Sequence, residues 1–475
     1  MKNLKNNNME LIKSTHCDIN YLARIVNVKE FEPHPNPEVT RLKLVAIGGY
    51  KVIVGIDSQP GYYVYFPALS QINPEFLSFA NLYRHSEKNA NPEKTGLFED
   101  SGKVTAIKLK GQVSEGFLIE FSILNNWFLS TVNKEIIPGD NEEFDSVQEG
   151  TKTFWINRKY IIPYSQKGTN AAQASGKTRQ AKKGLDRVIP EQFRFHYSTV
   201  IIKKCPYVVQ PEDLISITSK WHGTSGISAY VLCHTKHTWS IGKKIANFFA
   251  RIFKNPISDI DYDYIYASRT VIKNQFANPT EGFYGVDVWK YADDVVRPHL
   301  TKGMTAYYEI CGFLPDGKYI QKNYDYGCVP PSDDHYTEGV NFKVMIYRLT
   351  LTDPDGRVHE FSAREVQQWC TYNGLTPVHE LYYGYAKDLY SQLMQDVNGS
   401  ELISTDWCNQ FIEALANDKE RFYMEANSPD CKNKVPHEGL VIKTEKMKSE
   451  AWKLKCFAFL KGELAETESN IEDNA

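Results

Sequence analysis

A single lysine stands at the end of an apolar stretch, and a glycine-containing turn follows it at once. The residues Leu214–Ser219 lead into Lys220, and Gly223 comes three positions later. This arrangement exposes an amine beside a backbone that a ligand can approach closely. A lysine acts as a nucleophile only when burial or nearby positive charge favours its neutral form. Lys220 is therefore a candidate nucleophile, although a K-x-H-G segment taken alone fits a chance surface lysine better.

Three later segments place charged side chains inside apolar, strand-like runs. Glu438 precedes a run that ends in Lys443, and Glu309 is a lone carboxylate in another run. Lys453 and Lys455 are two residues apart, so both lie on one face of a strand. Buried charges are costly unless they pair with each other or with a ligand. A nucleoside triphosphate with a divalent metal would balance them, with the lysines at phosphate oxygens and Glu438 at the metal. The same positive charge would favour the neutral form of the nucleophile.

Taken in order, these segments resemble the covalent nucleotidyltransferase superfamily of ATP-dependent ligases and capping enzymes. The resemblance rests on K-x-H-G at Lys220, E-G-x-V-x-K at Glu438 and K-x-K at Lys453, and it covers roughly residues 200–460. DNA ligases and capping enzymes usually carry Asp where this chain has His222, which indicates the RNA ligase branch. Ser219 departs from the family, because many relatives have a longer polar residue there, and the contact to the purine edge stays open.

The resemblance implies a set of site residues. The catalytic residues would be Lys220, His222, Glu438, Lys443, Lys453 and Lys455, with Glu438 also binding the metal. The nucleotide would be bound by Lys220, Gly223, Arg269, Glu309, Tyr347, Lys443, Lys453 and Lys455. All of these follow residue 200.

Single positions in this set have alternatives. Arg269 belongs to a segment, Ser268–Thr270, that resembles the arginine motif of the family, and Glu309 would contact the ribose. Tyr347 would stack on adenine, with Phe342 as the alternative ring, and a plain core aromatic is equally compatible with the sequence. His222 could also be a turn histidine that forms its hydrogen bonds locally.

The chemistry implied is ATP-dependent joining of a 3′-hydroxyl to a 5′-phosphate. AMP would form a covalent bond to Lys220 and then pass to the 5′ end, with Mg²⁺ or Mn²⁺ neutralising charge. The expected partner is RNA or a nicked RNA/DNA duplex. Three alternatives remain open: a capping-type guanylyltransferase that prefers GTP, a DNA ligase, and a non-catalytic RNA-binding protein.

Residues 1–160 are predicted to form an OB-fold nucleic-acid-binding domain. Short β-branched or aromatic runs alternate with Pro and Gly there, namely Tyr21–Phe31, Arg41–Ile47, Lys51–Ile56, Tyr62–Phe66 and Lys103–Lys110. The segments His34–Gly55 and Val104–Gly116 resemble RNA-binding OB modules and the N-terminal module of one RNA ligase class. DNA ligases and capping enzymes carry this barrel after K-x-K instead, where only about 20 residues remain here. A domain that merely braces the catalytic part is the alternative.

The rest of the chain is predicted to comprise a basic flexible linker (161–190), an α+β adenylyltransferase domain (191–462) and an acidic disordered tail (463–475). In the linker, Ser175–Thr178 looks like the end of a P-loop, but Ala171 occupies the place of the first glycine. In the catalytic domain, the clearest helices are Ala363–Asn373 and Asp406–Lys419.

Composition sets the broad class. The chain has 475 residues, and its 55 basic and 58 acidic residues give a net charge of −3, so a nucleic-acid site would be a local patch. Nine cysteines without a C-x-x-C pair indicate reduced thiols, and Cys233, His234 and His237 lack a second ligand pair for zinc. No apolar run reaches membrane-spanning length. A soluble, cytoplasmic monomer is expected.

One segment remains without a role in this assignment. Ile245–Phe253 is apolar and flanked by lysines, as in a membrane-surface helix. We expect instead that the insertion 240–260 packs its apolar face on the catalytic domain.

Overall fold

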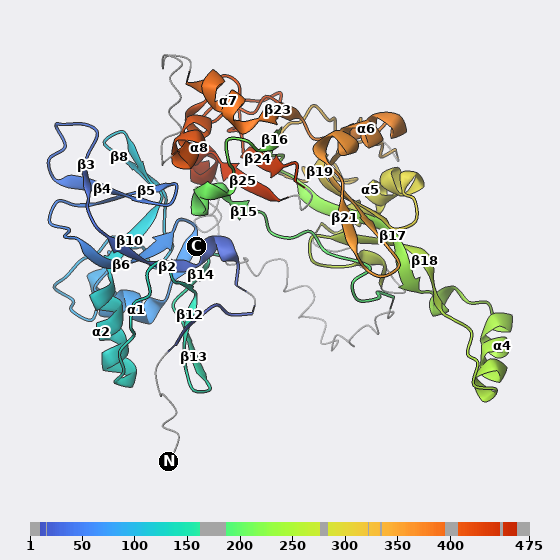
Figure 1. The fold of residues 1–475 in the computed structure, drawn as a ribbon, viewed down its shortest axis with the longest axis horizontal. Coiled ribbons are helices and arrows are strands. Elements are labelled where there is room, and N and C mark those ends of the chain that lie inside the picture. The colour runs from blue at the N-terminus through green and yellow to red at the C-terminus, as the bar shows by residue number, and fades with distance from the viewer. Residues whose placement is uncertain are drawn as a thin grey trace.

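The protein has a mixed α+β fold, shown in Figure 1 as a computed structural model. The structure describes residues 10–15, 17–161, 187–275, 284–321, 323–332, 335–394, 407–446 and 450–462. Most of the predicted basic linker, the P-loop-like segment and the predicted acidic tail lie outside the described residues. Arg187 falls within the predicted flexible linker but is buried in the structure, where its guanidinium pairs with Asp263 at 2.5 Å and donates to the carbonyl of Asn274.

The N-terminal part consists of small antiparallel sheets and two helices. The largest sheet has the order β10-β6-β2-β11 (Gly116–Glu120, Gly61–Pro67, Ala23–Val28, Glu143–Phe144). Two three-stranded sheets are β3-β4-β5 (Glu32–Pro33, Leu42–Ile47, Tyr50–Gly55) and β1-β12-β13 (Glu10–Ile12, Ser146–Glu149, Lys152–Trp155). Two pairs complete the part, β8-β9 (Ile107–Leu109, Gln112–Ser114) and β14-β7 (Asn157–Lys159, Ser70–Ile72). The helices are α1 (Pro74–Phe79), capped by Asn73, and α2 (Phe121–Val132).

These pairings agree with most of the strands predicted for the N-terminal part. The predicted strand Lys103–Lys110 is shorter, since only Ile107–Leu109 is extended and paired. Among the described strands the hydrogen bonding forms separate sheets and does not close into one barrel, so the structure does not show the predicted OB-fold.

The first sheet of the C-terminal part has the order β15-β25-β24-β16-β23. Its strands are Val200–Ile201, Ala451–Lys455, Gly439–Thr444, Leu214–Ser219 and Glu380–Tyr385. Alternate residues of these strands face opposite sides. On one side Ile217, Ile442, Trp452 and Leu454 enter a core together with residues of α7 (Ala386–Leu393) and α8 (Trp407–Asn417). The opposite side of the sheet is left for polar residues.

The second sheet has the order β18-β17-β19-β20-β21, with β22 added beside β20. Its strands are Ile260–Ser268, Thr224–His234, Met304–Gly312, Phe342–Thr352, Val358–Glu360 and Thr376–Pro377. Helices α5 (Val288–Val296) and α6 (Ala363–Asn373) pack against it. The bounds of α6 agree with the prediction because Ser362 and Glu365 form a capping box and Gly374 ends the helix in the left-handed conformation.

Short 3₁₀ turns connect these elements, at Ile19–Tyr21, Ser86–Lys88, Ile202–Lys204, Pro206–Val208, Lys236–Thr238, Lys273–Gln275 and Arg297–His299. The N-terminal part is joined to the first C-terminal sheet at its β15 edge. The amide of Ile201 donates to the side chain of Asn20 at 2.7 Å, and Lys203 pairs with Glu115 at 2.7 Å. Two parts that are distant in the sequence therefore meet beside β25.

The insertion does not pack on the domain as expected. It forms α4 (Ile241–Ile252), which stands at the far end of the arm made by β17 and β18 (Figure 1). Its apolar residues are exposed, with Ile241 and Phe253 each 78 % accessible. The expectation fails because the arm carries the helix away from the body of the domain.

Candidate active site

Neighbouring strands of the first C-terminal sheet bring the charged site residues together. In β25 the burial pattern alternates, so that Trp452 and Leu454 enter the core while Lys453 and Lys455 lie on the other side. Val441 of β24 pairs with Lys453, and Ser219 at the end of β16 pairs with Leu440. Glu438 precedes β24, and Lys220 follows β16. Because the two strands are antiparallel, Glu438 and Lys220 meet at the same end of the strand pair.

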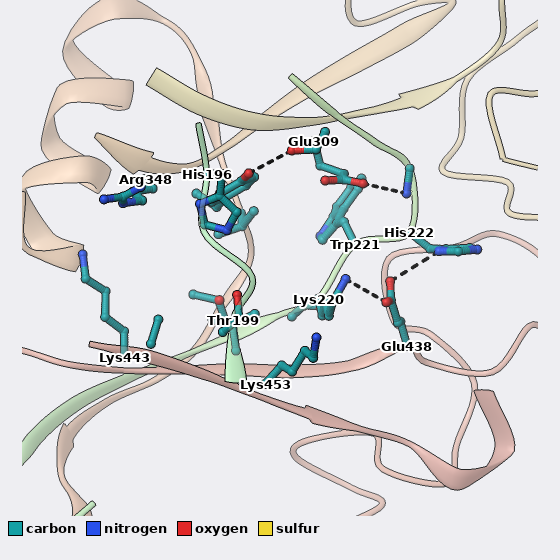
Figure 2. Close-up of a pocket in the computed structure, with 18 of the residues that line it drawn as sticks. His196, Thr199, Lys220, Trp221, His222, Glu309, Arg348, Glu438, Lys443 and Lys453 are labelled. Carbon is teal, nitrogen blue, oxygen red and sulfur yellow. Dashed lines mark hydrogen bonds and ion pairs between the residues drawn. The ribbon is translucent and has the colours of Figure 1, made fainter. Parts of the chain in front are cut away.

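Lys220 forms an ion pair at this end of the strands. Its Nζ lies 2.7 Å from Oε1 of Glu438, and Nδ1 of His222 lies 3.5 Å from Oε2 of the same carboxylate. Figure 2 shows both contacts. Glu438 is buried, and burial alone would raise its pKa, but Lys220 and His222 hold the pKa of this carboxyl well below its usual range. Glu438 is thus a buried, ionised carboxylate beside the candidate nucleophile.

Two glycines let the backbone approach closely here. Gly439 has φ +138° and its carbonyl accepts the backbone N–H of Lys220 at 2.8 Å. A Cβ at Gly439 would collide with the carbonyl of Leu454, and one at Gly223 would collide with the carbonyl of Ile310. The glycines of the K-x-H-G and E-G segments thus allow the turn and the strand to pack.

The second sheet supplies the opposite wall. Glu309 of β19 pairs in register with Ser225 of β17, and its Oε1 accepts the N–H of Gly223 at 3.1 Å. Burial raises the pKa of Glu309 to about 7, and Glu438 adds to the rise. The hydroxyl of Tyr347 in β20 lies 3.1 Å from Oγ of Ser225. Tyr347 lines the cavity, whereas Phe342 is buried and stacks on Tyr336 in the core.

The lysines of the first sheet differ in their surroundings. Burial, and then the charges of Lys455 and Lys220, lower the pKa of Lys453 to about 7. Lys443 donates to the carbonyl of Phe361 at 2.6 Å and lies 3.7 Å from Glu360, so in this structure it points to β21. An anion beside Lys453 would favour its charged form, which is the behaviour expected of a phosphate site.

A cavity of about 510 Å³ joins these residues. Its lining includes every residue assigned to the site from the sequence, namely Lys220, His222, Gly223, Arg269, Glu309, Tyr347, Glu438, Lys443, Lys453 and Lys455. In Figure 2, Lys443, Lys453 and Glu438 lie along one side and Glu309 and Arg348 along the other. The motifs therefore mark one site.

Residues that precede residue 200 also line the cavity. The N-terminal part contributes Asp18, Tyr21, Leu69, Lys103, Lys159 and Tyr160. Nζ of Lys159 lies 3.9 Å from Asp18 and 5.4 Å from the centre of the Tyr21 ring. No local sequence signal marks these residues, because they reach the cavity only through the docking of the N-terminal part at β15.

Two groups in the cavity wall have no motif of their own. His196 packs edge-on to Tyr347, and burial, with Arg348 and Arg269, lowers its pKa to about 3, so the ring is neutral. Arg348 forms a bidentate pair with Glu360 at 2.8 Å. The position of Arg348 directly after Tyr347 is a usable sequence signal, whereas His196 has none.

A polar cluster, buried except for His379, adjoins the candidate nucleophile. Ser219, next to Lys220, donates to Asp430 at 2.5 Å, and its Oγ lies 2.9 Å from Nε2 of His437. Asp430 also contacts Nδ1 of His379 at 3.0 Å. Ser219 directly precedes Lys220, and His437 directly precedes Glu438. Ser219, the residue that departs from the family pattern, therefore has its hydrogen-bond partners within this cluster.

Comparisons with known proteins concern the fold alone. No family model and no curated protein matches the sequence. Among solved structures, the chain is similar to the RNA ligase of Naegleria gruberi with pyrophosphate (TM-score 0.51, 14 % identity, 94 % of this chain and 100 % of the other). It is also similar to a point mutant of that ligase with ATP and Mn (TM-score 0.52, 14 % identity, 93 % and 99 % covered). The likeness confirms, for the fold, the resemblance indicated by the motifs.

Proposed function

We propose that this protein is an ATP-dependent RNA ligase that joins 3′-hydroxyl and 5′-phosphate ends through a covalent AMP on Lys220. The observation that carries the proposal is the position of Lys220, whose amine lies in a cavity with Glu438 and with the lysine pair of β25. The fold likeness to an RNA ligase supports it, and so does His222 in the K-x-H-G segment.

The cavity residues fit a nucleotide. Tyr347 and Val378 offer apolar surface for a base, and Glu309 is placed for a ribose hydroxyl. Lys453 and Lys455 stand on the same strand face as cations for phosphate oxygens. The pKa of Lys453 is lowered because its buried positive charge lies near other cations, and a bound anion would relieve this repulsion.

A divalent metal fits beside Glu438. Its Oε2 is buried and has no hydrogen-bond partner among the described residues, and Nδ1 of His222 lies 3.5 Å from it. Magnesium typically uses one or two carboxylates together with substrate phosphates, so one protein carboxylate suffices. When bound, Mg²⁺ or Mn²⁺ would neutralise charge on the phosphates.

The residues of the chain would act in three transfers. The amine of Lys220, after losing a proton, would attack the α-phosphorus of ATP, so that an N–P bond forms and pyrophosphate leaves. The AMP would then pass to a 5′-phosphate, which frees Lys220. A 3′-hydroxyl would finally attack that end and release AMP. In each transfer Lys453 and Lys455 would stabilise charge on the phosphorus oxygens, which is the main source of catalysis in phosphoryl transfer.

We further propose that the N-terminal part is the module that holds the polynucleotide, which is RNA or a nicked RNA/DNA duplex. Its lysines 103 and 159 reach the rim of the same cavity. Basic and aromatic residues side by side are suited to single strands and phosphates. The docking at β15 gives this module a fixed place relative to the nucleophile.

Strand joining tests the proposal. The full-length protein is incubated with ATP, Mg²⁺ or Mn²⁺ and nicked duplexes whose 3′-hydroxyl strand is either RNA or DNA. We expect the RNA-containing nick to be sealed and a 5′-adenylylated strand to accumulate when the 3′-hydroxyl is replaced by hydrogen. Transfer of GMP to a 5′-diphosphate RNA end, without sealing, would instead identify a capping enzyme.

A further inference from the structure

Helix α4 is exposed over most of its surface, and its apolar side chains are among the exposed ones. Its exposed apolar side chains, here called the α4 face, are Ile241, Ile245, Phe248, Phe249, Ile252 and Phe253. They recur at intervals of three, four and one residues, which places them on one side of a helix. Asn247, on the other side, is buried, and its Oδ1 accepts the N–H of Ile257 at 2.8 Å. The apolar side, which a surface helix usually buries, is therefore left exposed.

The charges on α4 have a single sign. Lys243, Lys244, Arg251 and Lys254 lie on or directly after the helix, and no acidic residue occurs from Trp239 to Pro256. With 100° between successive residues, these cations fall outside the arc of the α4 face. Asp259, an acid near the base of the helix, is paired with Lys236 at 3.0 Å and with His234 at 3.0 Å. The apolar face is therefore bordered by positive charge.

The surroundings of α4 leave this face accessible. The helix stands at the tip of the β17–β18 arm, remote from the N-terminal part (Figure 1). Ser240 caps its first turn by accepting the N–H of Lys243 at 3.2 Å, so the helix has its own start signal. No residue of α4 lines the candidate active site. A flat surface could therefore contact the helix while the cavity stays open.

We propose that α4 is a docking helix for a membrane surface with anionic lipid headgroups, independently of the proposed function. Such helices lie in the headgroup region with Phe and Ile among the acyl chains and Lys and Arg at the phosphates. No helix among the described residues is long and apolar enough to cross a bilayer, so α4 would lie on the surface.

Other partners fit the α4 face less well than a membrane surface does. A helix of this length is about 18 Å long. The surface area of one of its faces is smaller than the roughly 800 Å² that each partner buries in a stable protein pair. A second copy pairing helix to helix would also bring the four cations of each copy together. RNA would use the cations but would leave the α4 face exposed to water.

Vesicle flotation tests the proposal on the full-length protein. Vesicles of phosphatidylcholine alone are compared with vesicles that also contain about 30 mol % phosphatidylserine. We expect the protein to float with the anionic vesicles and not with the neutral ones. Phe248→Ser with Phe249→Ser should lower binding by about a hundredfold, and Lys243→Gln with Lys244→Gln by about thirtyfold. Leu97→Ser with Ile137→Ser, at positions 72 % and 80 % exposed on the N-terminal part, should bind like the wild type.

Three results would overturn the proposal. The first is absence of flotation with anionic vesicles. The second is equal flotation of the α4 variants and the wild type, since that would place the lipid contact elsewhere. The third is self-association in sedimentation experiments without lipid that the Phe248 and Phe249 substitutions abolish, because a second copy would then be the occupant. Adenylylation of the α4 variants at the wild-type rate serves as the control for folding.

Discussion

The amine of Lys220 lies 2.7 Å from Oε1 of Glu438, and the two residues stand at adjoining ends of the neighbouring strands β16 and β24. The pair holds the proposed nucleophile beside a buried carboxylate. Because Glu438 is also the only charge partner of Lys220 within 4.0 Å among the described residues, changes at this carboxylate should act on the first chemical step.

Replacing the carboxylate of Glu438 should disable the site. Glu438→Gln keeps the volume but removes the charge that positions Lys220 and would bind a metal. We expect the rate of covalent AMP attachment at saturating ATP to fall by about 10²-fold or more. Initial rates with labelled ATP measure this, and Glu93→Gln, at an exposed position, is the matched control. A rate within twofold of wild type would remove Glu438 from the mechanism.

The lysine pair of β25 should affect the same step. Lys453→Met and Lys455→Met each remove a cation from the wall of the cavity while keeping an apolar stem. Adenylylation should slow by about 10²- to 10³-fold, since charge on the α-phosphate would lose a partner. Lys318→Met, at a side chain that is 77 % exposed, controls for loss of a lysine in general. If both variants react like the control, the two lysines are surface charges without a role.

Nucleotide binding should take up a proton near neutral pH. The pKa of Lys453 is lowered to about 7 by burial and by Lys455 and Lys220, so the free protein holds this amine largely neutral above that pH. A triphosphate favours the charged form, so binding raises the pKa and captures a proton between about pH 7 and 9. The affinity should consequently fall as the pH rises through this window.

Calorimetry measures that uptake. An α,β-methylene analogue of ATP, which blocks the transfer, is titrated at pH 8 in two buffers of different ionisation enthalpy. The difference in heat gives the number of protons, which we expect to be between about 0.5 and 1 and to vanish in Lys453→Met. Proton release, or an unchanged uptake in the variant, would contradict the assignment.

The motif residues were predictable, but their partners were not. Strand alternation and the order of the segments indicated Lys220, Glu438, Lys453 and Lys455, because a charge inside an apolar run is itself a signal. The pairing of Lys443 with Glu360 depends on how β21 lies beside the first sheet, which no local pattern encodes. The same holds for Lys159, which reaches the cavity through tertiary docking.

For the fold, too, the features set by neighbouring residues were predictable and those set by tertiary contacts were not. α6 was predicted with its observed bounds because its caps are local, in Ser362, Glu365 and Gly374. The exposed position of α4 was not, because an amphipathic pattern does not say whether the apolar side meets the domain or leaves it. In the N-terminal part, the sequence indicated most of the strands but not which strands pair in each sheet.

The polar cluster behind Lys220 should contribute to stability. Asp430→Asn weakens the bonds from Ser219 and His379 and leaves buried polar groups poorly paired. We expect a loss of about 1–3 kcal/mol in the free energy of unfolding, measured by urea denaturation. Asp355→Asn, whose side chain is 76 % exposed, should change it little. An unchanged midpoint for Asp430→Asn would show that the cluster is not a structural support.

The most direct measurement of the central claim is covalent labelling of the full-length protein with α-labelled ATP or GTP in the presence of Mg²⁺ or Mn²⁺. We predict an acid-labile phosphoramidate with ATP and not with GTP, located at Lys220 by peptide mapping and absent from Lys220→Ala and Lys220→Arg. Release of the label by added pyrophosphate would show that the bond lies on the reaction path. Labelling that persists in both variants, or that maps to another residue, would contradict the assignment of Lys220 as the nucleophile.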